Sequence, residues 1–152
     1  QAAPMIKQIK QLNLGTKFLG GDGIHTTKLI KAADETGVGV YASLPGAPLN
    51  EMPGGKIFAE KFKTQYGVIQ LYAPYAYDAT MVMVSAMKKA DSTNPEKYLP
   101  AIKASQYSGV TANAISFDEK GDLKEPAITI YKVEAGNWKT EKIVKSIVSA
   151  NQ

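Results

Sequence analysis

The chain has 152 residues, 44% of them hydrophobic, so it is long enough and apolar enough to bury a core. Its 18 basic residues are all lysine and outweigh 14 acidic ones, which gives a net charge of +4 without any arginine. Because the arginine fork makes the bidentate contacts to phosphates and guanines, this charge argues against a nucleic-acid partner. Cysteine is absent, which excludes thiolate catalysis, disulfides and cysteine-ligated zinc.

The first 44 residues predict helices that alternate with strands. A helix is expected over residues 4–14, beginning at a proline and ending before a glycine, and a short strand at residues 18–19. A second helix, capped by threonine, covers residues 27–37, and residues 38–42 form a buried strand. This alternation is typical of an α/β domain with parallel strands flanked by helices.

Residues 45–55 interrupt this pattern, because they hold three prolines and three glycines with few apolar anchors. We interpret them as a hinge or linker. Helices are predicted beyond it at residues 56–66, 75–90 and 95–105. The inward-facing positions expected on the first and last of these helices include Ile57, Phe58, Phe62, Tyr66, Tyr98, Leu99 and Ile102.

A charged segment joins two predicted strands at residues 112–117 and 127–133. A calcium loop of the EF-hand type starting at Asp118 would need a glycine at its sixth position, where Leu123 stands. The sequence instead favours a turn in which Gly121 adopts a positive φ and its charged neighbours stay in water. No cofactor-binding signature is present, since the glycine spacing fits neither phosphate-binding loop.

Asp22 is the residue most suggestive of a binding site. It stands between glycines in FLGGDG, at the C-terminal end of a predicted strand, which is the edge where open α/β sheets bind ligands. A role as a helix cap or turn aspartate remains equally open. A lone carboxylate with tyrosines nearby suits an ammonium group, and Tyr72, Tyr75 and Tyr77 are candidate aromatic walls. The alternative is that these tyrosines only cover the start of a helix.

His25 is the only histidine, and we interpret it as a surface or capping group, with a catalytic or ligand-contacting role as the alternative. An acid–base enzyme using Asp22 and His25 would need both side chains on one helix face, and Gly23 between them argues against that. No nucleophile elbow is present. The sequence therefore predicts a protein without catalytic residues.

The chain resembles the second half of a bacterial periplasmic branched-chain amino-acid-binding protein of the Leu/Ile/Val type. The resemblance extends from about Pro4 to Trp138 and rests on KFLGGDGI, GVYAS, FAEKFKTQYG, YAPYAYDATMVMVSAM and FDEKGDLKEPAITIYKV. It implies an incomplete type I periplasmic-binding fold with parts of two lobes. Residues 4–44 would belong to the C-terminal lobe, 56–117 to the N-terminal lobe, 118–139 to the last crossover and return strand, and 140–152 to a C-terminal tail.

The resemblance also implies the function. Asp22, where many relatives have glutamate, would hold the α-ammonium of a free amino acid, with Gly23 beside it. Tyr77, and after it Tyr75, would line the same pocket. The implied protein is the periplasmic solute-binding component of an ABC-type importer, whose partners are a free amino acid, branched-chain or otherwise apolar, and an inner-membrane permease. A sensing domain of the same fold, signalling to a partner protein, is the alternative.

The family's chains run to more than twice this length, so we expect a fragment or a half that pairs with a complementary half or with itself. The groups that would bind the ligand carboxylate lie outside this sequence, and free leucine should bind weakly or not at all. We also expect that a targeting segment of the precursor has been removed, because residues 1–10 lack a signal-peptide core.

Overall fold

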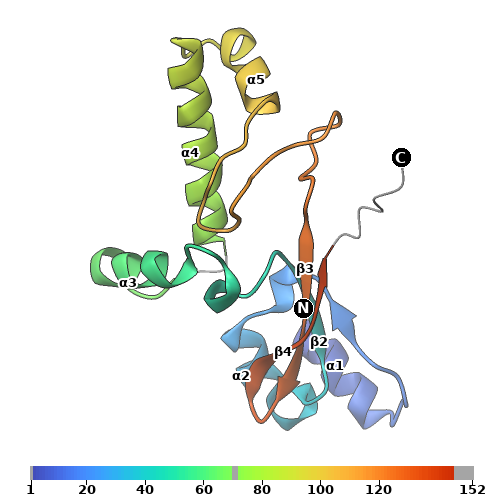
Figure 1. The fold of residues 1–152 in the computed structure, drawn as a ribbon. Helices are drawn as coiled ribbons and strands as arrows, with labels where there is room; N and C mark the ends of the chain where they lie inside the picture. The colour runs from blue at the N-terminus through green and yellow to red at the C-terminus, as the bar shows by residue number, and fades with distance from the viewer. Residues whose placement is uncertain (1, 70–71, 146–152) are drawn as a thin grey trace. The chain divides into compact units, whose positions relative to one another are not determined.

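The computed structural model describes residues 2–69 and 72–145 (Figure 1). The described chain divides into two compact units, and each has its own secondary structure. The first unit combines the residues up to Gly46 with those from Ala127 onward, and the second is Ala47–Pro126. Helices and strands are both present, so the predicted α/β class is confirmed.

The first unit is built around a four-stranded sheet with the strand order β1-β2-β3-β4. Its elements are α1 (Ala2–Gln11), β1 (Leu19–Gly20), a 3-10 turn (Asp22–Ile24), α2 (Thr27–Ala33), a second 3-10 turn (Asp34–Gly37), β2 (Tyr41–Pro45), β3 (Ala127–Glu134) and β4 (Asn137–Lys145). The pair β1–β2 is parallel, with Leu19 opposite Tyr41, whereas β3 and β4 each run antiparallel to their neighbours. The sheet is thus mixed, and the expectation of parallel strands holds only for its first pair.

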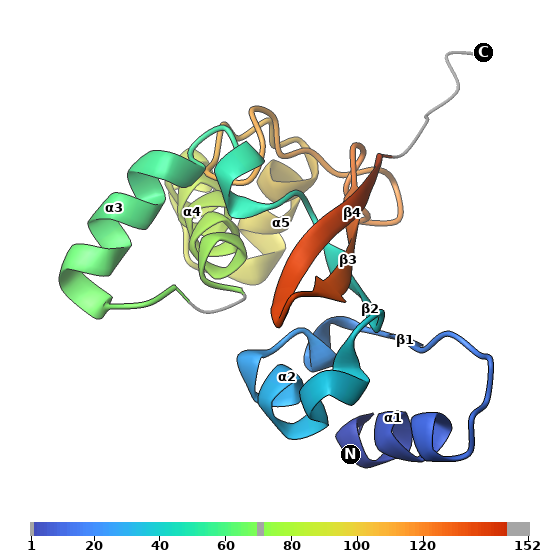
Figure 2. The ribbon, with the colours of Figure 1, turned by 90° about the horizontal axis from the view of Figure 1, so that it is seen from below.

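Strand β4 differs from the prediction, which places residues 140–145 in a tail. Figure 2 shows β3 and β4 side by side, and they pair over Ala127–Lys145 with Val133 opposite Trp138. The connecting turn has positive φ at both Ala135 and Gly136, the backbone that a tight two-residue hairpin requires. The rest of the predicted tail lies outside the described residues.

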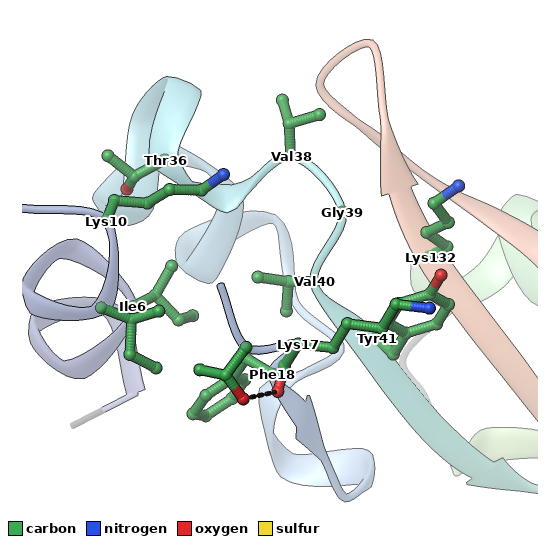
Figure 3. Close-up of a pocket in the computed structure, with 12 residues that line it drawn as sticks. Ile6, Lys10, Lys17, Phe18, Thr36, Val38, Gly39, Val40, Tyr41 and Lys132 are labelled. Atoms are coloured by element: carbon green, nitrogen blue, oxygen red, sulfur yellow. Dashed lines mark hydrogen bonds between the residues drawn. The ribbon is translucent and has the colours of Figure 1, made fainter. Parts of the chain in front are cut away.

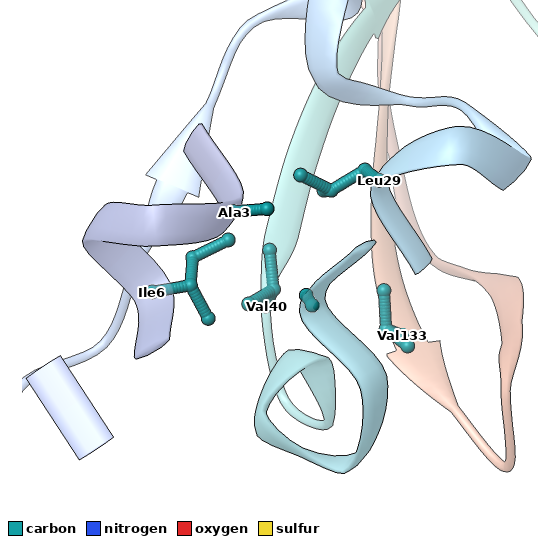
Figure 4. Close-up of a cluster of buried hydrophobic side chains, with 6 residues drawn as sticks. Ala3, Ile6, Leu29, Val40 and Val133 are labelled. Atoms are coloured by element: carbon teal, nitrogen blue, oxygen red, sulfur yellow. The ribbon is translucent and has the colours of Figure 1, made fainter. Parts of the chain in front are cut away.

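The core of the first unit lies where α1 and α2 meet β2 and β3. Figure 4 shows side chains from these elements converging on one cluster. Its buried members are Ala3, Ile6, Leu29, Ala33, Val40 and Val133. Thr26 fixes the start of α2, because its Oγ1 accepts a hydrogen bond from Leu29 N at 3.1 Å. The predicted threonine cap is confirmed at Thr26.

The second unit contains three longer helices, all near their predicted positions: α3 (Gly55–Tyr66), α4 (Ala73–Ala90) and α5 (Pro95–Lys103). Gly67 ends α3 with a φ of 80°, and Asn94 caps α5 by accepting a hydrogen bond from Glu96 N at 3.0 Å. The predicted inward faces are partly wrong. Ile57 and Tyr66 on α3 and Leu99 on α5 are exposed.

The strand expected at residues 112–117 does not form. The segment makes only isolated bridges, Tyr107 with Ile115 and Phe117 with Leu123. The charged turn that follows agrees with the prediction, because Gly121 has a φ of 91°. The Oδ1 atom of Asp118 accepts hydrogen bonds from Lys120 N and Asp122 N, each at 2.9 Å, so this carboxylate holds its own turn.

Two features are absent from the described residues, 2–69 and 72–145. None of the helices in these ranges is long and apolar enough to cross a membrane. The same ranges contain no group of three or more histidine, cysteine, aspartate or glutamate side chains placed to hold a metal ion.

Candidate functional site

The turn that carries Asp22 directly follows β1. Gly21 leaves the strand in an extended conformation, and Ile24 N then donates to Gly21 O at 3.2 Å and His25 N to Asp22 O at 2.9 Å. The Oδ1 atom of Asp22 accepts a hydrogen bond from Gly23 N at 2.8 Å. Asp22 is therefore a half-buried turn aspartate and does not cap α2, a role that Thr26 takes. Because a carboxylate can accept several hydrogen bonds, the bond from Gly23 N is compatible with an ammonium ligand.

The glycines on either side of Asp22 differ in their surroundings. A Cβ atom at Gly20 would lie 2.6 Å from Ile24 Cδ1, so a larger residue there would displace the Ile24 side chain. A Cβ atom at Gly23 would meet no heavy atom within 4 Å, and the φ of Gly23 is not in the left-handed region. The space beside Gly23 is open, and another group can approach the backbone there.

An aromatic cluster holds the residue that ends this turn. The ring of His25 lies 4.4 Å from the ring of Tyr131 and 4.7 Å from that of Trp138, centroid to centroid. Trp138 Nε1 donates to Thr26 O at 3.3 Å. Burial lowers the pKa of His25 below its ordinary value of 6.5, and its buried Nε2 has no hydrogen-bond partner among the described residues.

The interpretation of His25 as a capping group is confirmed for its backbone, because its N–H caps the 3-10 turn at Asp22 O, whereas the interpretation as a surface group is wrong for its half-buried side chain. Its ring packs against β3 and β4, and it anchors the turn after β1 to that hairpin. The acid–base alternative with Asp22 loses its premise as well, because the two residues do not share a helix: Asp22 belongs to the 3-10 turn, and His25 comes before α2.

The second unit carries the two predicted tyrosines on the first turns of α4. Tyr75 is half-buried, and Tyr77 is 47% exposed. The ring of Tyr77 lies 5.5 Å from that of Phe58 on α3. Burial, with smaller contributions from the charges of Tyr77 and Asp78, raises the pKa of the nearby Tyr107. Tyr77 offers the more accessible aromatic face of the pair.

Asp78 fixes the start of α4, a role that the sequence reasoning missed. It is only 3% exposed, and its carboxylate accepts hydrogen bonds from Val110 N at 2.8 Å and Thr111 N at 2.7 Å. Thr111 Oγ1 donates to the same carboxylate at 2.6 Å. Gly109 lies directly against it, because a Cβ atom there would be 2.6 Å from Asp78 Oδ2. The sequence signal for this buried role was a single aspartate within the apolar run YAYDATMVMV, because a charged side chain in such a run has to find hydrogen-bond partners.

The predicted ligand residues therefore fall into two groups. Asp22 and Gly23 are neighbours in one turn of the first unit, joined by a hydrogen bond, and Tyr75 and Tyr77 lie two residues apart on α4 of the second unit.

Comparison with known proteins decides the family. A model described as "Periplasmic binding protein" matches residues 1–137. The chain belongs to the periplasmic binding protein family. Since this is a family of binding proteins, the prediction that the chain is not an enzyme is confirmed. The resemblance to a periplasmic binding protein is confirmed as well.

Two proteins similar in sequence are consistent with this family assignment. The chain is 30% identical over 138 residues to a leucine-, isoleucine-, valine-, threonine- and alanine-binding protein of Pseudomonas aeruginosa, covering 90% of this chain and 36% of that protein. It is 28% identical over 136 residues to a Leu/Ile/Val-binding protein homologue of Brucella abortus, with the same coverage. The chain thus spans about a third of the length of these relatives.

A solved structure supports the fold. A leucine-binding protein from Thermotoga maritima superimposes with a TM-score of 0.78 at 27% identity, over 93% of this chain and 41% of that protein. The predicted type I periplasmic-binding fold is confirmed by this likeness to the periplasmic binding protein family.

Proposed function

We propose that the chain contributes the ammonium-binding part of the ligand site in an amino-acid-binding component of an ABC-type importer. Family membership supports a solute-binding role. The observation that carries the proposal is the half-buried Asp22 carboxylate after β1, next to the open space at Gly23. The names of the relatives from Pseudomonas and Brucella favour a branched-chain or other small apolar amino acid as the ligand.

The chemistry follows from the Asp22 turn. Its carboxylate accepts a hydrogen bond from Gly23 N, and a carboxylate has the capacity to accept others from an α-ammonium group. The absence of a side chain at Gly23 would let the ligand backbone lie against the turn. Tyr75 and Tyr77 are the ligand-contacting residues we propose for the second unit. Binding involves no bond making or breaking.

In this proposal residues 4–44 belong to the C-terminal lobe of the family's fold, residues 45–55 are the hinge and residues 56–117 belong to the N-terminal lobe. Residues 118–139 lead back into the C-terminal lobe, where β3 pairs with β2. The chain acts in the bacterial periplasm, where it meets an inner-membrane permease. A longer parent protein, or pairing with a complementary half, completes the two lobes.

The 152-residue chain should bind weakly by itself. Micromolar affinity corresponds to about 8 kcal/mol, and hydrogen bonds to a charged carboxylate contribute roughly 1.5–3 kcal/mol each. The chain spans 36% of the relatives' length, so we expect the partners of the ligand carboxylate to be missing and a leucine dissociation constant of about 1 mM or weaker.

Titration of the 15N-labelled chain with leucine, followed by amide chemical shifts, tests the proposal. The expected shifts lie in the Asp22 turn and around Tyr75 and Tyr77, and they are lost in Asp22→Asn. Asp34→Asn is the matched control, because it removes an exposed aspartate from the same unit and should leave the titration unchanged. Leucine shifts that persist in Asp22→Asn would contradict the assignment, and micromolar affinity would contradict the expected weakness.

A further inference from the structure

Helix α4 has an apolar face that the described chain leaves open. The buried face of the helix includes Asp78, Val82 and Ala86. With about 3.6 residues per turn, the opposite face carries residues spaced three and four apart. They are Ala76, Thr80, Met83, Val84 and Met87, which we call the α4 stripe. Met83 is 39% exposed, and the first two members of the stripe are exposed as well.

The α4 stripe has no charged member. The charged residues of α4 are Asp78, on the buried face, and Lys88 and Lys89, in the last turn. Thr80 Oγ1 donates to Ala76 O at 2.8 Å, so its hydroxyl is satisfied within the helix. A surface helix normally carries polar residues opposite its buried face, whereas a helix that is apolar all round is typical of a buried position. The composition of α4 therefore indicates packing on both faces.

The cavity of the first unit differs from the α4 stripe in its charge. It has a volume of about 300 Å³ and opens between α1, the segment before β1 and the start of β2 (Figure 3). Lys10, Lys17 and Lys132 line it, and Lys10 and Lys17 are exposed. Because water solvates these ammonium groups, the cavity needs no partner to cover it. The α4 stripe offers water no such groups.

The second unit lacks the layer on which an apolar helix of an α/β protein packs. Its described residues, 47–69 and 72–126, form helices, a 3-10 turn (Leu49–Glu51) and isolated bridges, but no β-strand. Helices of α/β folds bury their apolar side against a sheet. The first unit has such a sheet, and its α1 and α2 share a core with it. The α4 stripe is thus a helix face without a sheet.

A covering sheet can come from the part of the fold that this chain does not span. The chain covers 36% of the Pseudomonas relative and 41% of the leucine-binding protein from Thermotoga, so more than half of each lies outside the matched part. A second copy of this chain is a poor substitute, because the face of its sheet opposite the core carries Lys132, Lys139 and Lys142. Burying these ammonium groups against an uncharged helix face would be costly.

We propose that the α4 stripe docks on an apolar β-sheet supplied by the remaining part of the same periplasmic-binding fold. Met83 and Met87 fill the gaps between sheet side chains, since methionine adapts to irregular surfaces. Ala76 lets the sheet approach closely at the other end of the helix. The surface includes neither Asp22 nor Gly23, so this proposal does not rest on the amino-acid site.

Thiol labelling tests this docking surface, because the chain has no cysteine of its own. Met83→Cys places one thiol in the stripe, and Ser85→Cys, at an exposed position on another side of α4, is the matched control. Each variant is treated with a maleimide in two forms. One is the 152-residue chain, and the other is a chimera in which this chain replaces the 138 matching residues of the Pseudomonas relative. The chimera without an introduced cysteine gives the background.

Both thiols should react readily in the 152-residue chain, at low and at high protein concentration. In the chimera Met83→Cys should react at least about 10-fold more slowly, because a covered site reacts only when it opens, and Ser85→Cys should be unchanged. Equal reactivity of Met83→Cys in both forms overturns the proposal, as does equal protection of the two thiols. Protection that grows with the concentration of the 152-residue chain also overturns it, because a second copy would then cover the stripe.

Urea unfolding of the 152-residue chain examines the same surface without the chimera. Met83→Lys should shift the unfolding midpoint no more than Ser85→Lys, because an uncovered surface tolerates a charge. A much larger shift for Met83→Lys would contradict the proposal, since the stripe would already be covered within the chain. Asp22→Asn should leave the labelling of the chimera unchanged, so this proposal and the leucine site fail or hold separately.

Discussion

Asp78 in the second unit and His25 in the first are two polar side chains held in opposite ways. The Asp78 carboxylate is 3% exposed and receives three hydrogen bonds from Val110 and Thr111. The His25 imidazole is half-buried among aromatic rings, and its Nε2 is without a hydrogen-bond partner among the described residues. Hydrogen bonds hold the first side chain, and ring packing holds the second.

The difference shows how each unit fixes its candidate ligand residues. In the second unit a hydrogen-bonded carboxylate ties the first turns of α4, which carry Tyr75 and Tyr77, to the loop at residues 109–111. In the first unit ring packing ties the turn with Asp22 to the β3–β4 hairpin. Hydrogen bonds to a buried carboxylate are costly to lose, whereas a half-buried imidazole packed among rings becomes more costly when it is protonated.

The largest effect should come from Asp78→Asn. The amide keeps the size of the carboxylate but presents NH₂ to backbone N–H donors, so at least one of the three hydrogen bonds is lost and a buried donor stays unpaired. We expect a loss of about 3 kcal/mol in the free energy of unfolding, measured in urea. Asp91→Asn, at an exposed position in the left-handed C-cap of α4, is the control and should change little. Equal losses in both variants would contradict the role of Asp78.

Gly109→Ala should have the next largest effect. Its Cβ atom would lie 2.6 Å from Asp78 Oδ2, so the loop has to move away from α4. The expected loss is about 2 kcal/mol in the same urea measurement, as for other overpacked sites. At Gly15 a Cβ atom meets nothing within 4 Å, and Gly15→Ala is therefore the control. A Gly109→Ala protein as stable as the control would show that Asp78 and the loop are not in close contact.

The smallest effect is a pH dependence due to His25. Burial lowers its pKa in the folded chain below the ordinary value of 6.5, so the unfolded chain binds more protons between these two pKa values. Stability is therefore complete above pH 6.5 and should fall as the pH drops from 6.5 through the lowered folded-state pKa. His25→Phe keeps a ring against Tyr131 and Trp138 but cannot be protonated.

Urea unfolding of the wild type and His25→Phe across this pH range measures the effect. The unfolding free energy of the wild type minus that of the variant should be constant above pH 6.5 and should decrease as the pH falls below 6.5, because only the wild type loses stability there. A difference that stays constant over the whole range would mean that the folded chain accommodates the imidazolium as well as the unfolded chain does.

The sequence was most informative for features that are set by residues close together in the chain, such as helix ends. Gly67 and Asn94 mark helix ends through their own conformation and side chain, and they stand directly outside the helices predicted at residues 56–66 and 95–105. Strand β4 was missed because its exposed residues include Lys139, Glu141 and Lys142, and its turn uses Ala135–Gly136 in place of the more usual Asn–Gly. The predicted strand at residues 112–117 fails because its backbone finds only isolated partners.

In the candidate site, too, the local features could be predicted and the contacts between distant residues could not. Asp22 could be found from its glycines and its place after a strand, which are local features. The burial of His25 could not, because its aromatic partners are distant in sequence; Trp138 is 112 residues from the Thr26 carbonyl to which it donates. The Asp78 contacts are similarly non-local, since 32 residues separate it from Val110. Only the tertiary structure brings these groups together.

The central claim is that an amino acid is held by its ammonium group at Asp22, against the open backbone of Gly23. Intermolecular nuclear Overhauser effects between 13C-labelled leucine and the 15N-labelled chain test this most directly, because they report proximity even in weak complexes. The account predicts contacts from the leucine α-proton to Gly23, absent in Asp22→Asn. Contacts confined to other parts of the chain, or contacts to Gly23 that survive the loss of the Asp22 charge, would contradict it.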